Sequence, residues 1–346
     1  MQNKTEPTTP LRFSDVEALE DFMSQPTPEL EADLRAVDGD IIVLGAGGKM
    51  GPTLCILAKR AAPEKRVVAV ARFTEAGLEA RLKRAGVETI KCDLLEPAAV
   101  EALPKLRNVI FMAGRKFGTN GAEAVTWAFN TYMPALVAQA FKDSRIVALS
   151  TPCIYPYVSV LHQGALEEQV PAPLGEYGSS ALGRERMFEY FCNRTGTPGR
   201  LIRLSYAIDM RYGVLHDLAR MVLHEREINL ANGHFNVIWQ GDANAQILRA
   251  LRHCTSPLTA LNVSGPELGS VRALATEFGK LLGRTPRFKG AEEGTAWVVN
   301  TTKAARLFGN PRVTLGMLVD WTADWVAREM PRLEHDTHFS LRDGVY

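Results

Sequence analysis

One apolar stretch that runs into a cluster of glycines constrains this chain more than any other feature. Residues 40–51 are DIIVLGAGGKMG, and a helical pattern of apolar residues follows them. This order predicts a buried parallel strand that turns sharply into a helix. Gly45, Gly48 and Gly51 have GxxGxxG spacing. The first glycine would allow the tight turn, the second would let the backbone approach a pyrophosphate, and the third would let the helix pack on the strand.

The glycine turn is predicted to bind a dinucleotide. The unpaired amides and the positive end of the following helix would hold the phosphates. A second strand is predicted over 66–71, where a βαβ unit needs it. The alternative is a glycine-rich turn that only packs a helix on a strand. The residues of the turn that we expect in the cofactor site are Gly45, Gly47, Gly48, Lys49, Met50 and Gly51.

Predicted strands and helices alternate from residue 40 to residue 150. The strands are expected over 41–44, 66–71, 88–92, 108–112 and 145–150, and the helices over 52–62, 75–84, 96–103 and about 121–142. This alternation predicts an α/β fold with a Rossmann-type, doubly wound parallel sheet and a ligand at the carboxyl ends of its strands. Small or polar residues follow the later strands, as such a site requires: Arg72, Asp93, Gly114 and Thr151.

Arg72 bears on the choice of cofactor. Enzymes that use NAD usually place an acidic residue at the end of the second strand to bind the ribose 2′-hydroxyl, whereas this chain has Ala71 followed by Arg72. A guanidinium can pair with a 2′-phosphate, so NADP is favoured over NAD, with a surface arginine as the alternative. Asp93 would accept a hydrogen bond from the adenine amino group or would cap the next helix.

Composition excludes several other classes of function. With 346 residues, of which 46% are hydrophobic, the chain can bury one large core or two smaller ones. Forty basic residues against 39 acidic ones give no electrostatic support for a nucleic-acid or membrane partner. No apolar run reaches the ~18 residues of a membrane span, and the polar first ten residues lack the apolar core of a signal peptide. We therefore expect a cytoplasmic protein.

Metal binding is not expected either. The five cysteines are scattered and form no CxxC pair, which argues against a zinc site or a disulfide framework. Residues 335–338 (HDTH) contain two histidines near the end of the chain, but the sequence supplies no further ligands beside them.

The order of these segments resembles the extended short-chain dehydrogenase/reductase family, the NAD(P)-dependent epimerase/dehydratase group. The resemblance covers roughly residues 40–330 and, besides the glycine turn, is carried by 92–94, 109–114, Asn130, 149–155, 177–180, 203–205 and 262–267. It implies that Thr151 orients the substrate oxygen and that Tyr177 exchanges a proton with it. It adds Leu94, Ala113, Gly114 and Asn130 to the residues expected to bind the cofactor.

The family's catalytic lysine is missing. It follows the tyrosine in a YxxxK motif, lowers the pKa of the tyrosine and holds the nicotinamide ribose, but its position here is Ala181. A free tyrosine has a pKa near 10, far from a useful base at neutral pH. Arg184 lies two turns beyond Tyr177, ~10 Å along the helix, which we interpret as too far for direct pairing. Lys116 would reach the nicotinamide side from another loop, or would be solvated.

Three interpretations of Tyr177 stay open at this point. It acts as an acid–base group, it only donates a proton to a ketone, or it no longer catalyses. If the site is otherwise intact, Ala181→Lys is expected to increase dehydrogenase activity or to shift the alkaline limb of its pH profile.

Two departures from the family narrow the substrate class. Pro152 and Cys153 stand where sugar-nucleotide dehydratases have acidic residues, and Phe235 stands seven residues before Asp242, where epimerases commonly have an arginine that grips the diphosphate. A smaller carbohydrate-like substrate is therefore favoured. Its pocket would be lined from the distal region, with these candidates: Arg203, Tyr206, Arg211, His216, Trp239 and Gln240.

The domain organisation follows from the same comparison. We expect an N-terminal helical extension over 1–39, a dinucleotide-binding domain over 40–206, a mixed C-terminal substrate lobe mainly over 207–330 with some segments returning to the sheet, and a tail over 331–346. The predicted function is that of an NAD(P)-dependent oxidoreductase or epimerase that acts on a carbohydrate-like hydroxyl or ketone. The alternative is a dinucleotide-binding sensor or scaffold without turnover. By analogy with the family, the chain would form a homodimer.

Overall fold

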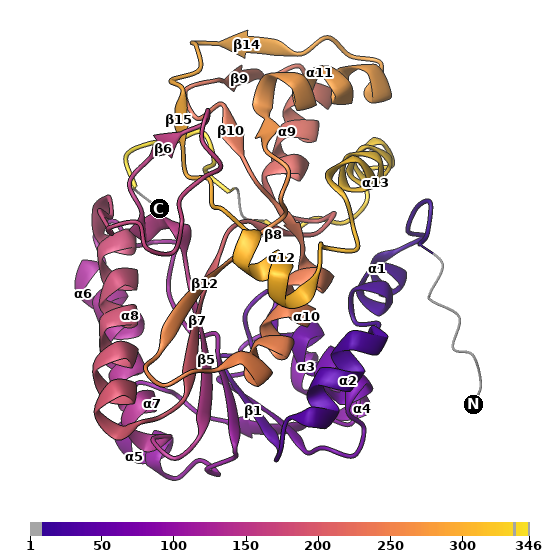
Figure 1. Ribbon diagram of the computed structural model, residues 1–346. Coiled ribbons are helices and arrows are strands. Elements are labelled where there is room, and N and C mark those ends of the chain that lie inside the picture. Colours follow the sequence, from indigo (N-terminus) through magenta and orange to yellow (C-terminus); the bar gives the residue numbers. More distant parts are fainter. Residues whose placement is uncertain (1–8, 335–336, 345–346) are drawn as a thin grey trace.

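The main sheet has seven parallel strands and lies beneath a smaller lobe (Figure 1). The computed structural model describes residues 9–334 and 337–344. The strands of the main sheet are β1 (Ile41–Leu44), β2 (Val67–Ala71), β3 (Glu88–Lys91), β4 (Asn108–Phe111), β5 (Arg145–Ser150), β7 (Gly199–Leu204) and β12 (Thr259–Val263). Their order across the sheet is β12-β7-β5-β4-β1-β2-β3. The predicted α/β fold with a doubly wound parallel sheet is confirmed.

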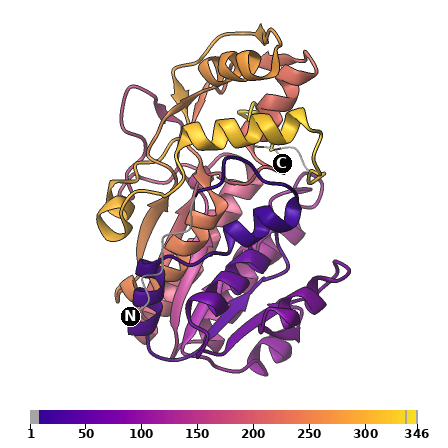
Figure 2. The same cartoon turned by 90° about the vertical axis from the view of Figure 1, so that its right-hand side faces the viewer.

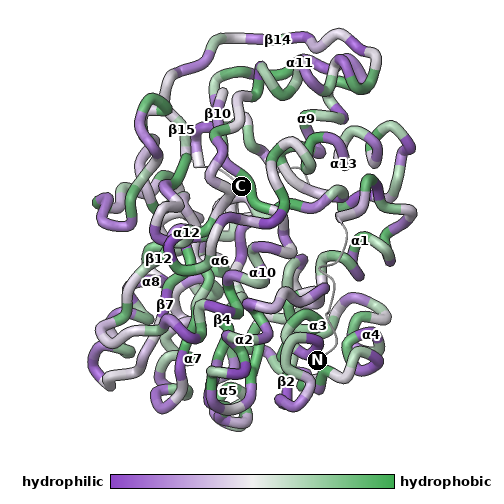
Figure 3. Tube along the Cα trace, turned by 45° about the vertical axis from the view of Figure 1, so that its right-hand side comes forward, coloured by the Kyte–Doolittle hydropathy of each residue, from purple (hydrophilic) through white to green (hydrophobic). Residues whose placement is uncertain are grey.

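The strands bury both of their faces because successive side chains point to opposite sides. In β1, Ile41 and Val43 belong to the core on one face, whereas Ile42 and Leu44 belong to the core on the other. The helices that cover the first face are α2 (Pro28–Ala36), α3 (Gly51–Ala61), α4 (Leu78–Arg84), α10 (Gln240–Arg249) and α12 (Thr302–Phe308). Those on the second are α5 (Pro97–Glu101), α7 (Met133–Ala140) and α8 (Gly175–Thr195). Figure 3 shows the apolar colour concentrated in this sandwich.

The long helix predicted over about 121–142 is interrupted by a π-helical segment. It consists of α6 (Glu123–Trp127), a π-helical turn (Ala128–Tyr132) and α7. Such turns are frequent at functional sites. Here the segment carries Asn130, which is completely buried.

The smaller lobe has its own apolar core, built from α9 (Val214–Leu223), α11 (Val271–Leu282) and α13 (Leu315–Ala327). Its short strands are β8 (Ala207–Ile208), β9 (Glu227–Asn229), β10 (His234–Phe235), β11 (Ile238–Trp239), β13 (Gly269–Ser270), β14 (Arg287–Lys289) and β15 (Thr295–Ala296), which pairs with β6 (Val158–Ser159). β10 and β11 follow each other closely in the chain but pair with different strands, β13 and β8.

The N-terminal helices join the two parts of the molecule. α1 (Val16–Met23) and α2 pack on α3 and α10 (Figure 2), and α1 also enters the core of the lobe. Asp15 caps α1 by accepting a hydrogen bond from the Ala18 amide. Glu20 pairs with Arg81 on α4 and with Arg211 in the lobe. Among the helices described, none is long and apolar enough to cross a bilayer.

Candidate active site

The glycine turn between β1 and α3 has the geometry that its sequence predicts. Gly45 has φ +90°, and a Cβ there would lie 2.5 Å from the Ala113 amide nitrogen. A Cβ on Gly51 would lie 2.3 Å from the Ala46 carbonyl oxygen, so α3 packs closely on the turn. A Cβ on Gly48 would have only one neighbour, the Gly45 carbonyl oxygen at 3.9 Å. The backbone at Gly48 therefore faces open space, and no side chain caps the start of α3.

A cavity of about 250 Å³ opens beside this turn, and we call it the glycine-loop cavity. The predicted cofactor residues that line it are Gly45, Gly47, Gly48, Arg72, Asp93, Leu94, Ala113 and Gly114. The Arg72 guanidinium lies 5.6 Å from the ring centre of Phe129, which holds it at the cavity wall. Asp93 accepts a hydrogen bond from the Leu95 amide at 3.0 Å, but it does not cap the next helix, because α5 begins at Pro97 and its N-cap is Glu96, without a capping side chain.

One residue of this cavity was missed in the sequence. Glu75 lines the glycine-loop cavity together with Arg72. Glu75 lies beyond the end of β2, where an acidic residue was sought, and the conformation of the loop places it beside the cavity. Between them is Phe73, which adopts a left-handed backbone conformation with φ +50°. A non-glycine residue in that conformation is uncommon, and such residues concentrate at ligand sites.

A second cavity of about 270 Å³ continues from the first, and we call it the tyrosine cavity. Met112 and Gly114, at the end of β4, line both. The predicted residues that line the tyrosine cavity are Met50, Gly114, Lys116, Thr151 and Tyr177. The two cavities thus form one cleft over the carboxyl ends of the strands, where a parallel sheet places its ligands.

Tyr177 and Thr151 meet in the tyrosine cavity. Burial and the neighbouring Cys153 raise the pKa of Tyr177 to about 12, against the lowering effects of the Arg184 charge and of a hydrogen bond with Thr151. Thr151 also accepts a hydrogen bond from the Cys153 amide at 3.2 Å, which fixes its side chain at the end of β5. Tyr177 is therefore protonated at neutral pH, as a proton donor must be.

Arg184 acts on Tyr177 through its charge, whereas the expectation that it lies too far for direct pairing stays a prediction. Its side chain lines the tyrosine cavity, and its charge affects the Tyr177 phenol. The guanidinium donates to the Leu149 carbonyl at 2.9 Å and to Asn130 Oδ1 at 2.7 Å. Helical side chains lean toward the N-terminus of their helix, so the arginine side chain extends from Arg184 toward the turns that carry Tyr177.

Lys116 also faces Tyr177. Its ammonium lies 5.9 Å from the centre of the Tyr177 ring, and burial lowers the pKa of Lys116. Two cations thus face the tyrosine from outside the YxxxK position. Ala181 itself is fully buried in a small apolar cluster with Ile154 and Tyr155 and does not line the cavity. A lysine at this position would be confined by that cluster, so the gain of activity expected for Ala181→Lys loses its basis.

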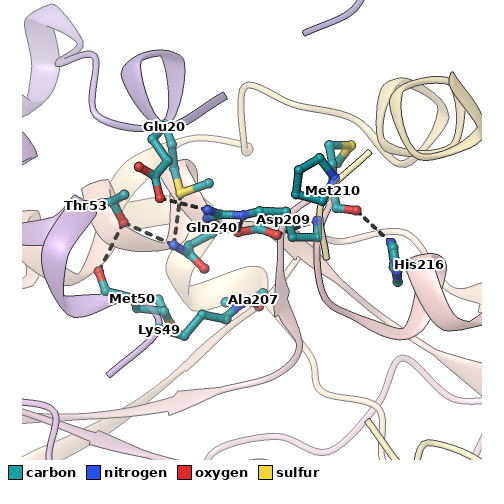
Figure 4. Close-up of polar contacts among 12 residues, drawn as sticks. Glu20, Lys49, Met50, Thr53, Ala207, Asp209, Met210, His216 and Gln240 are labelled. Atoms are coloured by element: carbon teal, nitrogen blue, oxygen red, sulfur yellow. Dashed lines mark hydrogen bonds and ion pairs between the residues drawn. The ribbon is translucent and has the colours of Figure 1, made fainter. Parts of the chain in front are cut away.

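Three predicted cofactor residues do not line the glycine-loop cavity and have other contacts. Lys49 donates to the Ala207 carbonyl oxygen at 2.7 Å, so its side chain ties the glycine turn to the lobe (Figure 4). Gly51 is packed against Ala46 beneath the turn. Asn130 binds the backbone amide and carbonyl of Arg115, each at 2.8 Å, and thereby holds the loop that carries Lys116.

Of the six lobe candidates, Tyr206 lines the tyrosine cavity, with a left-handed φ of +37°. The other five lie outside it, with these contacts: Arg203 pairs with Glu185, Arg211 with Asp209 and Glu20, His216 binds the Met210 carbonyl, Trp239 packs among aromatic rings and Gln240 binds Thr53. Trp297 and Tyr212 also line the cavity, and nothing in the sequence pattern singled them out.

The histidine pair at the end of the chain gives no metal site that can be described. Residues 335 and 336 lie outside the described residues. Thr337 donates to the Asp217 carboxylate, and the His338 ring lies 6.3 Å from that of Phe117. Elsewhere in residues 9–334 and 337–344, no group of three metal-ligating side chains is close enough to hold an ion.

The architecture is shared with solved epimerase structures. A UDP-glucuronic acid 4-epimerase from Bacillus cereus in complex with NAD is 19% identical, with a TM-score of 0.69 over 84% of this chain and 99% of that one. A UDP-glucose 4-epimerase from Thermotoga maritima with UDP-glucose is 17% identical, with the same TM-score and coverage. One from Thermus thermophilus with NAD is 18% identical, with a TM-score of 0.67 over 82% and 98% of the two chains.

Two comparisons of this chain by sequence gave no match. No protein-family model matches it, and no curated protein matches it. The structural likeness nevertheless spans most of this chain and almost all of each epimerase. The resemblance noted in the sequence is therefore confirmed at the level of the fold: this chain has the fold of the extended short-chain dehydrogenase/reductase enzymes.

Proposed function

We propose that the protein is an NAD(P)H-dependent reductase of a small carbohydrate-like ketone, in which Tyr177 donates the proton. The observation that carries this proposal is the hydroxyl pair of Thr151 and Tyr177 in a cavity that continues into the glycine-loop cavity. A nicotinamide dinucleotide supplies or accepts the hydride in this family of folds. A sensor without turnover would have no need for two hydroxyls hydrogen-bonded to each other at the hydride-transfer end of the cleft.

The residues of the cleft fit such a cofactor. The open space at Gly48 and the uncapped start of α3 leave room and amide donors for a pyrophosphate. Arg72, Asp93 and Leu94 line the far end of the glycine-loop cavity, where the adenosine would lie. Two of the three epimerase structures described above are named as complexes with NAD. Both NAD and NADP are compatible with this site, since Arg72 and Glu75 line the same cavity.

The protonation of Tyr177 favours reduction over oxidation. With its pKa raised to about 12, Tyr177 holds its proton at neutral pH and can give it to a carbonyl oxygen. Thr151 would donate a second hydrogen bond to that oxygen and polarise the carbonyl. Hydride adds to the carbonyl carbon, the C=O π bond becomes a C–O–H group with the Tyr177 proton, and a tyrosinate remains until solvent returns the proton.

Arg184 and Lys116 would stabilise the tyrosinate that proton donation leaves behind. Both side chains line the tyrosine cavity. A cation close to a developing anion in a partly dry site lowers the free energy of the charged state. In this proposal the two cations together take the role of the YxxxK lysine, whose position is occupied by Ala181.

The cavity favours a monosaccharide-sized substrate. Its volume of about 270 Å³ lies below the roughly 300–1,000 Å³ of drug-sized ligand sites, and the nicotinamide ring would occupy part of it. Phe235, at the position where the family's epimerases commonly carry an arginine, is buried in the apolar core of the lobe. The lobe therefore offers no guanidinium there to a nucleotide diphosphate. A cytoplasmic location and a homodimer stay predictions.

The test is a reduction assay on a panel of keto sugars and keto sugar acids with NADPH and with NADH. At least one compound should oxidise the cofactor in a Tyr177-dependent manner. Tyr177→Phe should lower kcat about a thousandfold because it removes the proton donor, while dinucleotide affinity, measured by fluorescence, should not change. Dinucleotide binding without turnover of any compound would favour the sensor. Equal activity of the Tyr177→Phe variant would contradict the role of Tyr177.

A further inference from the structure

Lys49 is the residue of the glycine turn to which the proposed reaction gives no role. It stands between Gly48, where the backbone faces open space, and Met50, which directly precedes α3. Its side chain lines neither cavity of the active-site cleft. Instead, the ammonium leaves the turn and donates to the Ala207 carbonyl oxygen at 2.7 Å (Figure 4). A cation in the expected phosphate-binding turn is therefore directed at the lobe.

The ammonium of Lys49 meets one short stretch of the lobe, residues 206–213. Besides its hydrogen bond to Ala207, it lies 4.8 Å from the ring centre of Tyr212, within the range of a cation–π contact. Burial lowers the pKa of Lys49 to about 8, and the nearby Asp209 carboxylate opposes that shift. Lys49 is therefore charged at neutral pH, and a charged donor makes a stronger hydrogen bond than a neutral one.

Residues 206–213, which we call the wall segment, form one side of the tyrosine cavity. The segment folds tightly on itself, because the Asp209 amide donates to the Tyr212 carbonyl at 3.1 Å and a Cβ on Gly213 would lie 2.4 Å from the Ile208 side chain. The residues that it contributes to the cavity lining are Tyr206, Ala207, Ile208, Tyr212 and Gly213. Its position therefore sets the shape of the cavity in which Tyr177 lies.

The wall segment is held on two sides by different parts of the chain. On one side, the Arg211 guanidinium pairs with Asp209 and with Glu20 of α1, each at 2.8 Å. On the other side, Lys49 joins it to the glycine turn. The first anchor does not involve the glycine turn, whereas the second depends on where that turn places Lys49. A ligand that fixes the turn would therefore strengthen the second anchor.

We propose that Lys49 is a positioning residue that couples dinucleotide binding to the wall of the tyrosine cavity. The inference rests on the dinucleotide site proposed above but not on reductase activity. A pyrophosphate at the amides beside Gly48 would restrain the backbone from which Lys49 extends. The hydrogen bond to Ala207 then passes this restraint to the wall segment. Because coupling between two sites is reciprocal, a substrate that orders the wall segment would also tighten dinucleotide binding.

The test is hydrogen–deuterium exchange of the full chain, read by mass spectrometry, with and without saturating ADP or 2′-phosphorylated ADP. These probes carry the two phosphates of a dinucleotide but neither the nicotinamide nor its ribose, so they would reach the wall segment only through the protein. In the unaltered chain the probe should slow exchange at 45–51 and, by at least about fivefold, at 206–213. Lys49→Met keeps an unbranched side chain without the ammonium. In this variant the slowing at 45–51 should remain and that at 206–213 should disappear.

The matched control is Lys65→Met. Lys65 also donates to backbone carbonyls, those of Val37 at 2.7 Å and Gly39 at 3.1 Å, but it precedes β2 at the amino end of the sheet and lines neither cavity of the cleft. This variant should keep the slowing at both segments. A lysine that only stabilised the fold would change basal exchange and leave the slowing by the probe in place.

The other outcomes contradict different parts of the proposal. Slowing at 45–51 alone in the unaltered chain would overturn the coupling. Slowing at 206–213 that persists in Lys49→Met would overturn the role of Lys49, and its loss in Lys65→Met as well would assign the effect to general destabilisation. No slowing at either segment with millimolar probe would refute the dinucleotide site itself, whereas a failure of the reduction assay alone would leave this inference standing.

Discussion

The two cavities of the active-site cleft have similar volumes, about 250 and 270 Å³, but the chain builds them in different ways. The glycine-loop cavity consists mostly of the first few residues after β1, β2, β3 and β4, with additions from α4 and the helix that contains Phe129. The tyrosine cavity combines ends of strands with α8, the segment before α9 and Trp297 in the lobe. One cavity is the product of local motifs and the other of tertiary assembly.

This difference explains which substitutions the fold tolerates. In the glycine-loop cavity the turn needs glycine at particular positions, because the backbone itself would contact the cofactor there. In the tyrosine cavity a charge is needed near the phenol, but its source is not fixed. Arg184 from the next turns of α8 and Lys116 from the loop after β4 both face Tyr177. Loss of the YxxxK lysine is thus compatible with a working site.

The largest effect is expected on the stability of the Ala181→Lys variant, which returns the lysine to its YxxxK position. Ala181→Lys places a charge in a fully buried apolar cluster. A fully buried lysine shifts its pKa by up to about 3–5 units, at ~1.4 kcal/mol per unit, so the free energy of unfolding should fall by roughly 4 kcal/mol. Denaturant unfolding measures it, with Tyr190→Lys on the exposed side of α8 as the control. Unchanged stability together with a gain of activity would show that the lysine reaches Tyr177 after all.

A smaller but distinctive effect is expected in the pH dependence of the two reaction directions. Reduction uses the protonated phenol, so its kcat/KM should be flat between pH 7 and pH 9. Oxidation of the alcohol needs the phenolate, whose fraction rises tenfold per pH unit below a pKa of about 12. Oxidation should therefore accelerate about a hundredfold over the same range. A plateau in the oxidation rate below pH 8 would contradict a high pKa for Tyr177 in the working enzyme.

Loss of the Arg184 charge should change the rate less than the roughly hundredfold change with pH expected for oxidation. Arg184→Met removes the charge and should lower kcat roughly tenfold to a hundredfold, as expected for a charged partner of an anion, with little change in KM. Arg184→Lys keeps a cation and should recover much of the loss. Thermal unfolding of both variants controls for the lost hydrogen bonds to Leu149 and Asn130. Equal losses in the two variants would assign Arg184 a structural role.

What could be predicted from the sequence divides in the same way, between local patterns and tertiary contacts. The strands β1 to β5 and the glycine turn could be predicted because each is a local pattern of apolar and small residues. Strands β7 and β12 were not predicted, because Arg200, Arg203 and Asn262 interrupt their apolar runs. Arg203 is tolerated there by its buried ion pair with Glu185, 2.8 Å away, and a pair that distant in sequence leaves no local signal.

The site residues divide in the same way. Thr151 and Tyr177 could be placed from the resemblance to the family, and the structure brings them into one cavity. The position of Arg184 in the tyrosine cavity was not foreseen, because its distance was counted along the helix axis without the direction and length of its side chain. Glu75 was missed because the search for an acidic residue stopped at the end of the second strand. In each case the missing information was three-dimensional.

The smallest effect is expected in the glycine-loop cavity, where Arg72 and Glu75 bear on the cofactor in opposite ways. Arg72→Ala should weaken NADP binding about tenfold by removing a charge-assisted contact to the 2′-phosphate, and should change NAD affinity much less. Glu75→Gln should strengthen NADP, because a carboxylate near the 2′-phosphate is repulsive. Dinucleotide titrations of both variants measure these changes. If Glu75→Gln weakens NAD and Arg72→Ala affects both dinucleotides equally, the carboxylate determines the preference. The residue that decides the cofactor would then be one that folding brings to the cavity, and the local origin of this half of the cleft would no longer hold.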